Sequence, residues 1–128
     1  SLDRLQVRMS LDPHALSAVY SVKGDSTQLP RVVALTVGSR SPSWQYLRCQ
    51  SMILLVDGER IAAATAFRDG SVQRGGVSEQ VTGVFPLNDF LRIAKARQVE
   101  GKVCSTEFSL SETDLIALRD FASRMGGR

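Results

Sequence analysis

Over the last third of the chain, the pattern of apolar and polar positions predicts the order strand, helix, strand, helix. Residues 81–85 form a run of apolar and β-branched residues that is typical of a strand. A helix is expected to begin at Pro86, because proline pre-sets the backbone angle of a first helical turn. The apolar residues of segment 87–94 recur on one face, so this helix is expected to pack against a sheet. A second strand is predicted over residues 99–110.

The terminal helix has the clearest start signal in the chain. Ser111 and Asp114 have the spacing of a capping box, in which each side chain accepts a hydrogen bond from the backbone N–H of the other residue. Gly126 and Gly127 are expected to end the helix, since glycine readily takes the left-handed conformation of a C-terminal cap. One face of the helix must be buried. That face carries Leu115, Leu118, Phe121, Ala122 and Met125.

Alternating and continuous apolar runs predict strands through the first two thirds of the chain. Turns are expected at Asp57-Gly58, Asp69-Gly70 and Gly75-Gly76, and residues 38–43 are expected to form an exposed loop. Residues 15–22 fit either a short helix or a strand, and their β-branched and aromatic content favours the strand. The predicted strands are 2–11, 31–37, 44–49, 52–56, 60–67 and 77–84.

Together these elements predict one α+β domain over residues 1–128. The connections between the central strands are too short to return the chain for a parallel pair, so an antiparallel meander is expected. The sheet is expected to be sandwich- or barrel-like, with one internal helix and the C-terminal helix packed on it. A chain of 128 residues has the size of a single domain.

Composition and charge narrow the function classes only slightly. The chain is 43% hydrophobic and 23% charged, as in a globular protein, and no apolar run reaches the roughly 20 residues of a transmembrane helix. All but three of the 16 basic residues are arginine, and the net charge is +3. Arginine suits contacts to carboxylates and phosphates, so an anion-binding face is one interpretation. Because the arginines are scattered among acidic residues, a dispersed surface distribution is favoured.

The two cysteines, Cys49 and Cys104, leave two interpretations open. In an exported protein they could form one long-range disulfide. In a reducing compartment they would instead be small buried apolar residues. Strand alternation places Cys104 on the same face as Phe108, which favours burial in either case.

The chain lacks the residues from which common catalytic and metal sites are built. His14 is the single histidine and is expected to be a solvated turn residue, so we predict neither a zinc site nor a histidine-activated nucleophile. Glu79, Glu100 and Glu107 could form a carboxylate pair only through the tertiary fold, and glutamates on a strand face are usually solvated. We therefore expect no catalytic residue, no cofactor and no metal.

Residues 40–48 are the best candidate for a binding surface. Trp44, Tyr46 and Arg48 alternate, so they are expected on one strand face, able to stack on bases or sugars, pair with an anion or join a protein interface. The favoured alternative is that Trp44 fills the end of the core and Arg48 lies along it, since tryptophan in a small domain is usually buried. The candidate binding residues are Arg40, Trp44, Tyr46 and Arg48, with Arg60 and Arg68 as neighbours from the next strand.

A series of short motifs between residues 44 and 125 carries a resemblance to a known group of domains. The motifs are Trp44-Gln45-Tyr46-Leu47, Leu55-Val56-Asp57-Gly58-Glu59-Arg60, Ile93-Ala94-Lys95-Ala96, Val99-Glu100-Gly101-Lys102 and Glu107-Phe108-Ser109-Leu110. On these motifs, the segment resembles uncharacterised bacterial domains that are often carried by exported or envelope-associated proteins. The resemblance implies a β-rich fold and a bacterial envelope setting, and it carries over no catalytic residue.

Two functions from different classes follow as hypotheses. The leading hypothesis is a non-catalytic module of a bacterial, periplasmic or otherwise exported protein that presents a sheet face or loop to a protein or envelope partner. The alternative is an anion- or nucleic-acid-binding domain that uses residues 40–48. A salt titration separates the two, because phosphate contacts weaken steeply as salt rises whereas apolar anchors change little.

Overall fold

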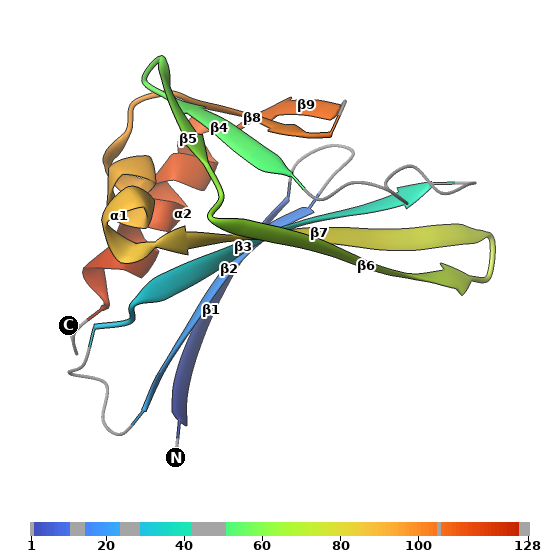
Figure 1. The fold of residues 1–128 in the computed structure, drawn as a ribbon, viewed down its shortest axis with the longest axis horizontal. Coiled ribbons are helices and arrows are strands. Elements are labelled where there is room, and N and C mark those ends of the chain that lie inside the picture. The colour runs from blue at the N-terminus through green and yellow to red at the C-terminus, as the bar shows by residue number, and fades with distance from the viewer. Residues whose placement is uncertain (1, 11–14, 24–28, 42–50, 105, 126–128) are drawn as a thin grey trace.

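The described part of the chain forms two antiparallel sheets and two helices (Figure 1). The computed structural model describes residues 2–10, 15–23, 29–41, 51–104 and 106–125. Within these residues all strand pairs are antiparallel and neither sheet closes into a barrel. The predicted α+β fold with antiparallel sheets is therefore confirmed.

Among the described strands, five form a main sheet and four form a small sheet. In spatial order, the main sheet contains β1 (Leu2–Ser10), β2 (Ala15–Lys23), β3 (Val32–Ser41), β7 (Gly76–Pro86) and β6 (Thr65–Gln73). The small sheet contains β5 (Glu59–Ala62), β4 (Met52–Val56), β8 (Val99–Val103) and β9 (Thr106–Ser109). The helices are α1 (Leu87–Lys95) and α2 (Glu112–Ser123), and neither of these two is long and apolar enough to cross a membrane.

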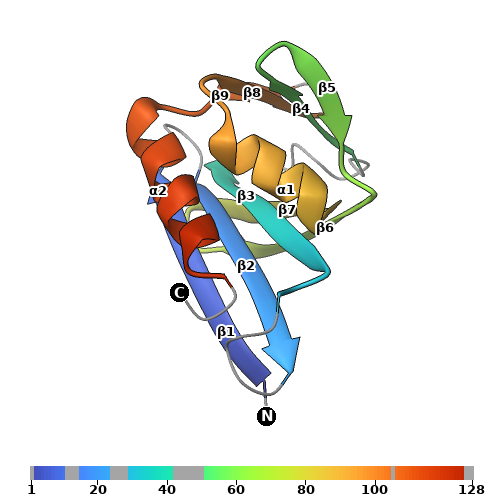
Figure 2. The same cartoon turned by 90° about the vertical axis from the view of Figure 1, so that its left-hand side faces the viewer.

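Both helices and the small sheet lie on one side of the main sheet (Figure 1). In Figure 2, α1 lies between the two sheets and α2 lies along β1 and β2. The packing agrees with this view, since α1 contacts β3, β7 and α2, while α2 contacts β1. None of the described elements covers the opposite face of the main sheet, which we call the open face.

One hydrophobic core joins the sheets and the helices. Alternate residues of β7 are buried, which is the period of a strand with one face against a core. Phe90 of α1 and Phe121 of α2 meet edge to face, with ring centroids 5.9 Å apart and ring planes at 80°. Burial of these two aromatic rings stabilises the contact between the helices. The core also contains Val33, Leu54, Phe85, Ile93, Val99 and Leu118.

The start of α2 is the one predicted from the sequence. Ser111 Oγ accepts a hydrogen bond from the backbone N–H of Asp114 at 3.1 Å, and Asp114 Oδ2 accepts one from the N–H of Ser111 at 3.0 Å. The capping box is therefore confirmed. The helix ends at Ser123 with Arg124 as its C-terminal cap residue, and the predicted glycine end at 126–127 lies outside the described residues.

The helix α1 begins one residue later than predicted. Pro86 is the last residue of β7 and occupies the cap position before the helix. The N–H of Leu87 donates to the carbonyl oxygen of Arg31 at 3.0 Å, and this bond ties the start of the helix to the start of β3. The strand therefore continues to the proline because β3 lies beside it up to that point.

In the N-terminal part, the strands predicted over 2–11 and 15–22 are confirmed as β1 and β2, and the helix alternative for the second segment is wrong. The exposed loop predicted from residue 38 is wrong as far as Ser41, because β3 continues to that residue. The reason is the length of β7, which supplies pairing partners for the end of β3. The strand predicted over 44–49 lies outside the described residues.

The turn predicted at Asp69-Gly70 is also wrong, since both residues lie within β6. The chain reverses between Gln73 and Gly76, where Gly75 has a φ of 85° that favours glycine. Asp69 Oδ1 accepts a hydrogen bond from the N–H of Gly70 at 2.8 Å. Pairing with β7 thus overrides a local Asp-Gly turn signal.

The strand predicted over 60–67 is divided between the two sheets. Residues of β5 pair with β4, whereas β6 pairs with β7. The chain crosses from the small sheet to the main sheet at Ala63 and Ala64. The N–H of Ala63 donates to the carbonyl oxygen of Met52 in the small sheet, and the N–H of Ala64 donates to that of Val84 in the main sheet, both at 2.9 Å. Alternation defines the two faces of a strand but not its neighbours, so it gave no sign of this crossing.

The strand predicted over 99–110 is likewise two strands, β8 and β9, which form a hairpin. Val103 pairs with Thr106, and Cys104 has a φ of 55° between them. A positive φ is uncommon for a residue with a side chain, so the sequence carried no turn signal at this position. This hairpin completes the small sheet, with β9 at its edge.

Candidate functional site

The outer face of the small sheet carries a groove of about 440 Å³. Alternate residues of β4 point to opposite faces, so Met52, Leu54 and Val56 are buried against the core while Ile53 and Leu55 line the groove. Leu55 is 43% exposed, which is high for a leucine in the middle of a sheet. The groove is lined by Ile53, Leu55, Arg60, Glu100, Gly101, Lys102, Glu107, Phe108 and Ser109.

The two central strands and the outer strands form two rows of side chains across this face. In one row, Arg60 of β5 is opposite Leu55 of β4, and Leu55 is opposite Glu100 of β8. In the other row, Ile53 of β4 is opposite Lys102 of β8, and Lys102 is opposite Glu107 of β9. The face therefore has an apolar centre on β4, with an arginine on one side and a mixture of carboxylates and an ammonium group on the other.

The charges of the groove have few partners within the protein. Among the described residues, the side chains of Arg60, Lys102 and Glu107 take part in no hydrogen bond or ion pair. Glu100 Oε1 accepts one hydrogen bond from Gln98 Nε2 at 3.1 Å. These polar groups can therefore bind a ligand without first breaking strong contacts with one another.

Gly101 makes the shape of the small sheet possible. It lies opposite Phe108 in the pairing of β8 with β9, and the phenyl ring covers it on the core side. A Cβ atom at Gly101 would lie 2.2 Å from Cζ of Phe108, a distance that real side chains do not reach. The glycine thus lets the ring close the inner face of the sheet beneath the groove.

Asp57 anchors the turn that connects β4 to β5. With φ of 51° at Asp57 and 84° at Gly58, these residues form the tight turn between β4 and β5 that the sequence predicts. Asp57 Oδ1 accepts hydrogen bonds from the N–H groups of Arg97 at 3.0 Å and Gln98 at 2.9 Å, and the N–H of Asp57 donates to the carbonyl oxygen of Gln98 at 2.9 Å. The turn is therefore joined to the connection between α1 and β8.

Cys104 lies in the turn between β8 and β9 and is disulfide-bonded. The other cysteine of the chain, Cys49, lies outside the described residues. The predicted pairing of Cys49 with Cys104 therefore stays a prediction.

Of the four candidate binding residues that the sequence proposes, the structure describes only Arg40. Arg40 is exposed on the open face of the main sheet, in register with Ser78 of β7. Trp44, Tyr46 and Arg48 lie outside the described residues, so their predicted role stays a prediction.

Arg60 and Arg68 were expected to come from one strand next to residues 40–48, but they belong to two different strands, β5 and β6. Arg60 lines the groove of the small sheet, whereas Arg68 is in β6 of the main sheet. The physical reason is the crossing at Ala63 and Ala64, which places the two arginines in different sheets.

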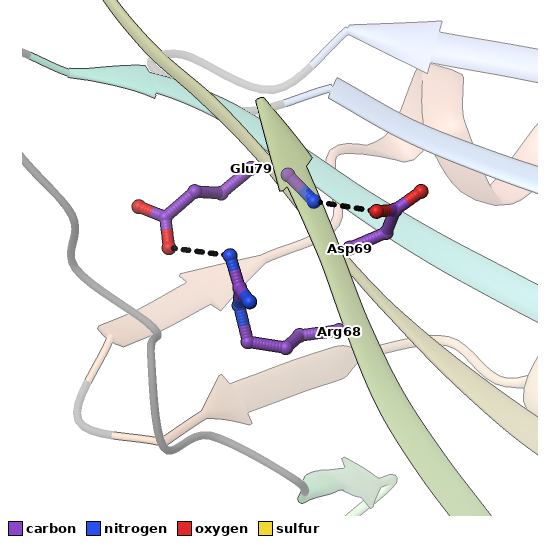
Figure 3. A network of polar contacts seen from close by, with 4 residues as sticks. Arg68, Asp69 and Glu79 are labelled. Atoms are coloured by element: carbon purple, nitrogen blue, oxygen red, sulfur yellow. Dashed lines mark hydrogen bonds and ion pairs between the residues drawn. The ribbon is translucent and has the colours of Figure 1, made fainter. Parts of the chain in front are cut away.

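Arg68 belongs to a buried polar cluster, shown in Figure 3. Its Nη2 lies 3.9 Å from Oε2 of Glu79, and the Glu79 side chain is 0% exposed. Ser39, which is opposite Glu79 in the pairing of β3 with β7, is also buried. The expectation that Glu79 is solvated is therefore wrong. A carboxylate at this depth needs a nearby cation, and Arg68 supplies one.

Of the three glutamates weighed as a carboxylate pair, only Glu100 and Glu107 lie on one face. Glu79 is buried in the main sheet, while Glu100 and Glu107 are exposed on β8 and β9 of the small sheet. Their strand partners place Glu100 and Glu107 diagonally across the outer face. The structure holds no group of three His, Cys, Asp or Glu side chains fit for a metal in the part of the chain that it describes, and His14 lies outside that part.

Sequence reasoning missed the groove itself. Residues 52–56 form one continuous apolar run, which is typical of a strand buried on both faces, so nothing indicated that Ile53 and Leu55 line a surface. Comparison of the chain with models of known protein families, with curated proteins and with solved structures found no match. The function must therefore be argued from the geometry of this site.

Proposed function

We propose that the chain is a non-catalytic binding module that holds a segment of a protein partner in the groove of the small sheet. The observation that supports this most is the half-exposed Leu55 at the centre of side chains that carry both signs of charge. An apolar anchor surrounded by polar groups is the usual plan of a protein interface. The polar groups fix the orientation of a partner, and the apolar centre supplies most of the binding free energy.

The balance of charge favours a protein partner over a nucleic acid. Two cations, Arg60 and Lys102, line the groove together with two carboxylates, Glu100 and Glu107. A phosphate backbone is bound by clustered lysine and arginine, and neighbouring carboxylates repel it. A peptide, in contrast, can present both an acidic and a basic side chain.

We also propose that the module belongs to an exported or envelope-associated bacterial protein. The disulfide at Cys104 supports this setting, because disulfides persist in oxidising compartments and are rare in the bacterial cytoplasm. Trapping of free thiols in cell fractions measures the redox state directly, and a fully reduced pool of the protein would contradict this setting.

The binding role is tested by placing a photo-crosslinking amino acid at position 55 in the cell that produces the protein. We expect a discrete crosslinked species with one partner, and the dissociation constant of that partner is then measured with purified protein. Leu55→Thr should weaken binding about tenfold or more, since loss of a central anchor commonly has this effect. Threonine suits a strand, so the fold should persist.

Phe67→Thr is the matched control. Phe67 is 50% exposed on β6 of the main sheet, opposite Thr82 of the open face, so it lies on another sheet than the groove. We expect this variant to bind the partner as the unaltered chain does. Equal binding by Leu55→Thr, or crosslinks obtained from position 67 in place of 55, would show that the groove is not the binding surface.

A further inference from the structure

Resting on the binding role proposed above, we infer the chemistry of the segment that the groove accepts. It is an extended peptide that presents an acidic, an apolar and a basic side chain at alternate positions. The order of charges across the small sheet and the width of that sheet both support this peptide.

Charge changes sign from one edge of the small sheet to the other. On the β5 side, the groove carries Arg60 and no carboxylate. On the β8 and β9 side, it carries Glu100 and Glu107 with one cation, Lys102, so the net charge there is negative. Leu55 and Ile53 separate the two sides. A complementary ligand therefore has an acidic group over β5, an apolar group over β4 and a basic group over β8 and β9.

An extended chain that crosses the strands reaches from one edge of the small sheet to the other with three alternate side chains. Neighbouring strands lie about 4.8 Å apart, so the distance from β5 to β9 is about 14 Å. In an extended peptide, side chains on one face recur about every 6.8 Å, and three successive ones span about 13.5 Å. The pattern is thus acidic, any residue, apolar, any residue, basic. Because the contacts are made by side chains, the peptide can lie in either chain direction.

An extended segment suits the shape of the groove better than the other occupants. Two copies of this chain would bring two hollowed faces together and leave a void between them, which costs stability. A phosphate group would gain Arg60 and Lys102 but meet Glu100 and Glu107 nearby. A mixed-charge peptide satisfies both signs of charge and fills the hollow over Leu55.

The inference is tested with blocked synthetic peptides and backbone amide spectra of the purified chain. The mixed peptide has the core Asp-Ser-Leu-Ser-Arg, and the comparison peptides replace its charged residues by two acids or by two bases. We expect the mixed peptide to shift the amide signals of Leu55 and Lys102, and to bind about threefold more tightly than either comparison peptide. A peptide with serine in place of its leucine should bind most weakly.

A charge reversal sharpens this test. Arg60→Glu places carboxylates at both edges of the groove, so the dibasic peptide should become the preferred one. Arg74→Glu is the matched control, because Arg74 is exposed in the turn between β6 and β7 and the same change of charge there should leave the preference unaltered. Reversal of preference by Arg60→Glu alone is the result that we expect.

Two failures are distinguishable. If all three charge patterns bind equally and Leu55→Thr still weakens binding, the inferred peptide chemistry is wrong while the groove remains the binding site. If no peptide shifts the groove amides and no partner crosslinks to position 55, the binding role itself is wrong. A dimer in sedimentation that Leu55→Thr dissociates would assign the face to a second copy and overturn the inference.

Discussion

The molecule has two sheet faces that no described element covers, and they differ in whether their polar side chains have partners within the protein. On the open face of the main sheet, Thr36 and Thr82 are opposite each other and their hydroxyl groups share a hydrogen bond of 2.9 Å. On the outer face of the small sheet, Arg60, Lys102 and Glu107 have no such partner among the described residues. Thr36 and Thr82 of the first face thus satisfy each other, whereas the charged groups of the second face can contact a ligand directly.

The two sheets also differ in how charge is buried. The main sheet places Glu79 in its covered face next to Arg68, so removal of either group would leave the other without its charged partner. In the small sheet, the covered face is apolar and the charges are exposed. A mutation in the buried pair should therefore affect stability, whereas one in the groove should affect binding.

The largest effect is expected from Arg68→Met. The variant removes the cation 3.9 Å from the carboxylate of Glu79, whose side chain has no exposed area. Loss of one partner of a buried pair commonly costs about 3 kcal/mol of unfolding free energy. Urea unfolding measures the change. Arg68→Lys keeps the charge and should lose less, and an equal loss in both variants would show that packing, not charge, is the cause.

A smaller effect is expected from Asp57→Ala. The variant removes the carboxylate that accepts hydrogen bonds from the N–H groups of Arg97 and Gln98. Because these bonds are exposed, we expect a loss of about 1 to 2 kcal/mol. Hydrogen exchange should accelerate at Arg97 and Gln98 but not in the main sheet.

Asp57→Asn is the control for this change, since its side-chain oxygen can still accept while asparagine tolerates the positive φ. Its unfolding free energy should lie close to that of the unaltered chain. Unchanged exchange at Arg97 and Gln98 in Asp57→Ala would contradict the anchoring role of the carboxylate.

The smallest effect is expected from the double variant Thr36→Val, Thr82→Val. It replaces both partners of the hydrogen bond on the open face by apolar groups of similar shape, so stability should change by less than about 0.5 kcal/mol. Binding of the mixed-charge peptide should be unaffected, as measured from the same amide signals. Weaker binding by this variant would show that the open face, and not the groove alone, contacts the ligand.

Local signals decided several features that could be predicted from the sequence. The capping box of Ser111 and Asp114 and the turn of Asp57 and Gly58 need only residues that are close in the chain. The apolar pattern within 77–84 likewise identified a strand, and it is part of β7. The α+β class followed from the number and order of such elements.

Tertiary pairing decided the rest. The predicted turn at Asp69-Gly70 does not form, because both residues lie in β6 and pair with β7. Residues 60–67 and 99–110 each contain two strands where one was predicted, because alternation indicates the faces of a strand but not its neighbours. The groove depends on the register that sets Leu55 beside Glu100, residues far apart in the chain. Short-range chemistry therefore determined which elements form, and only the assembled sheets determined which side chains share a surface.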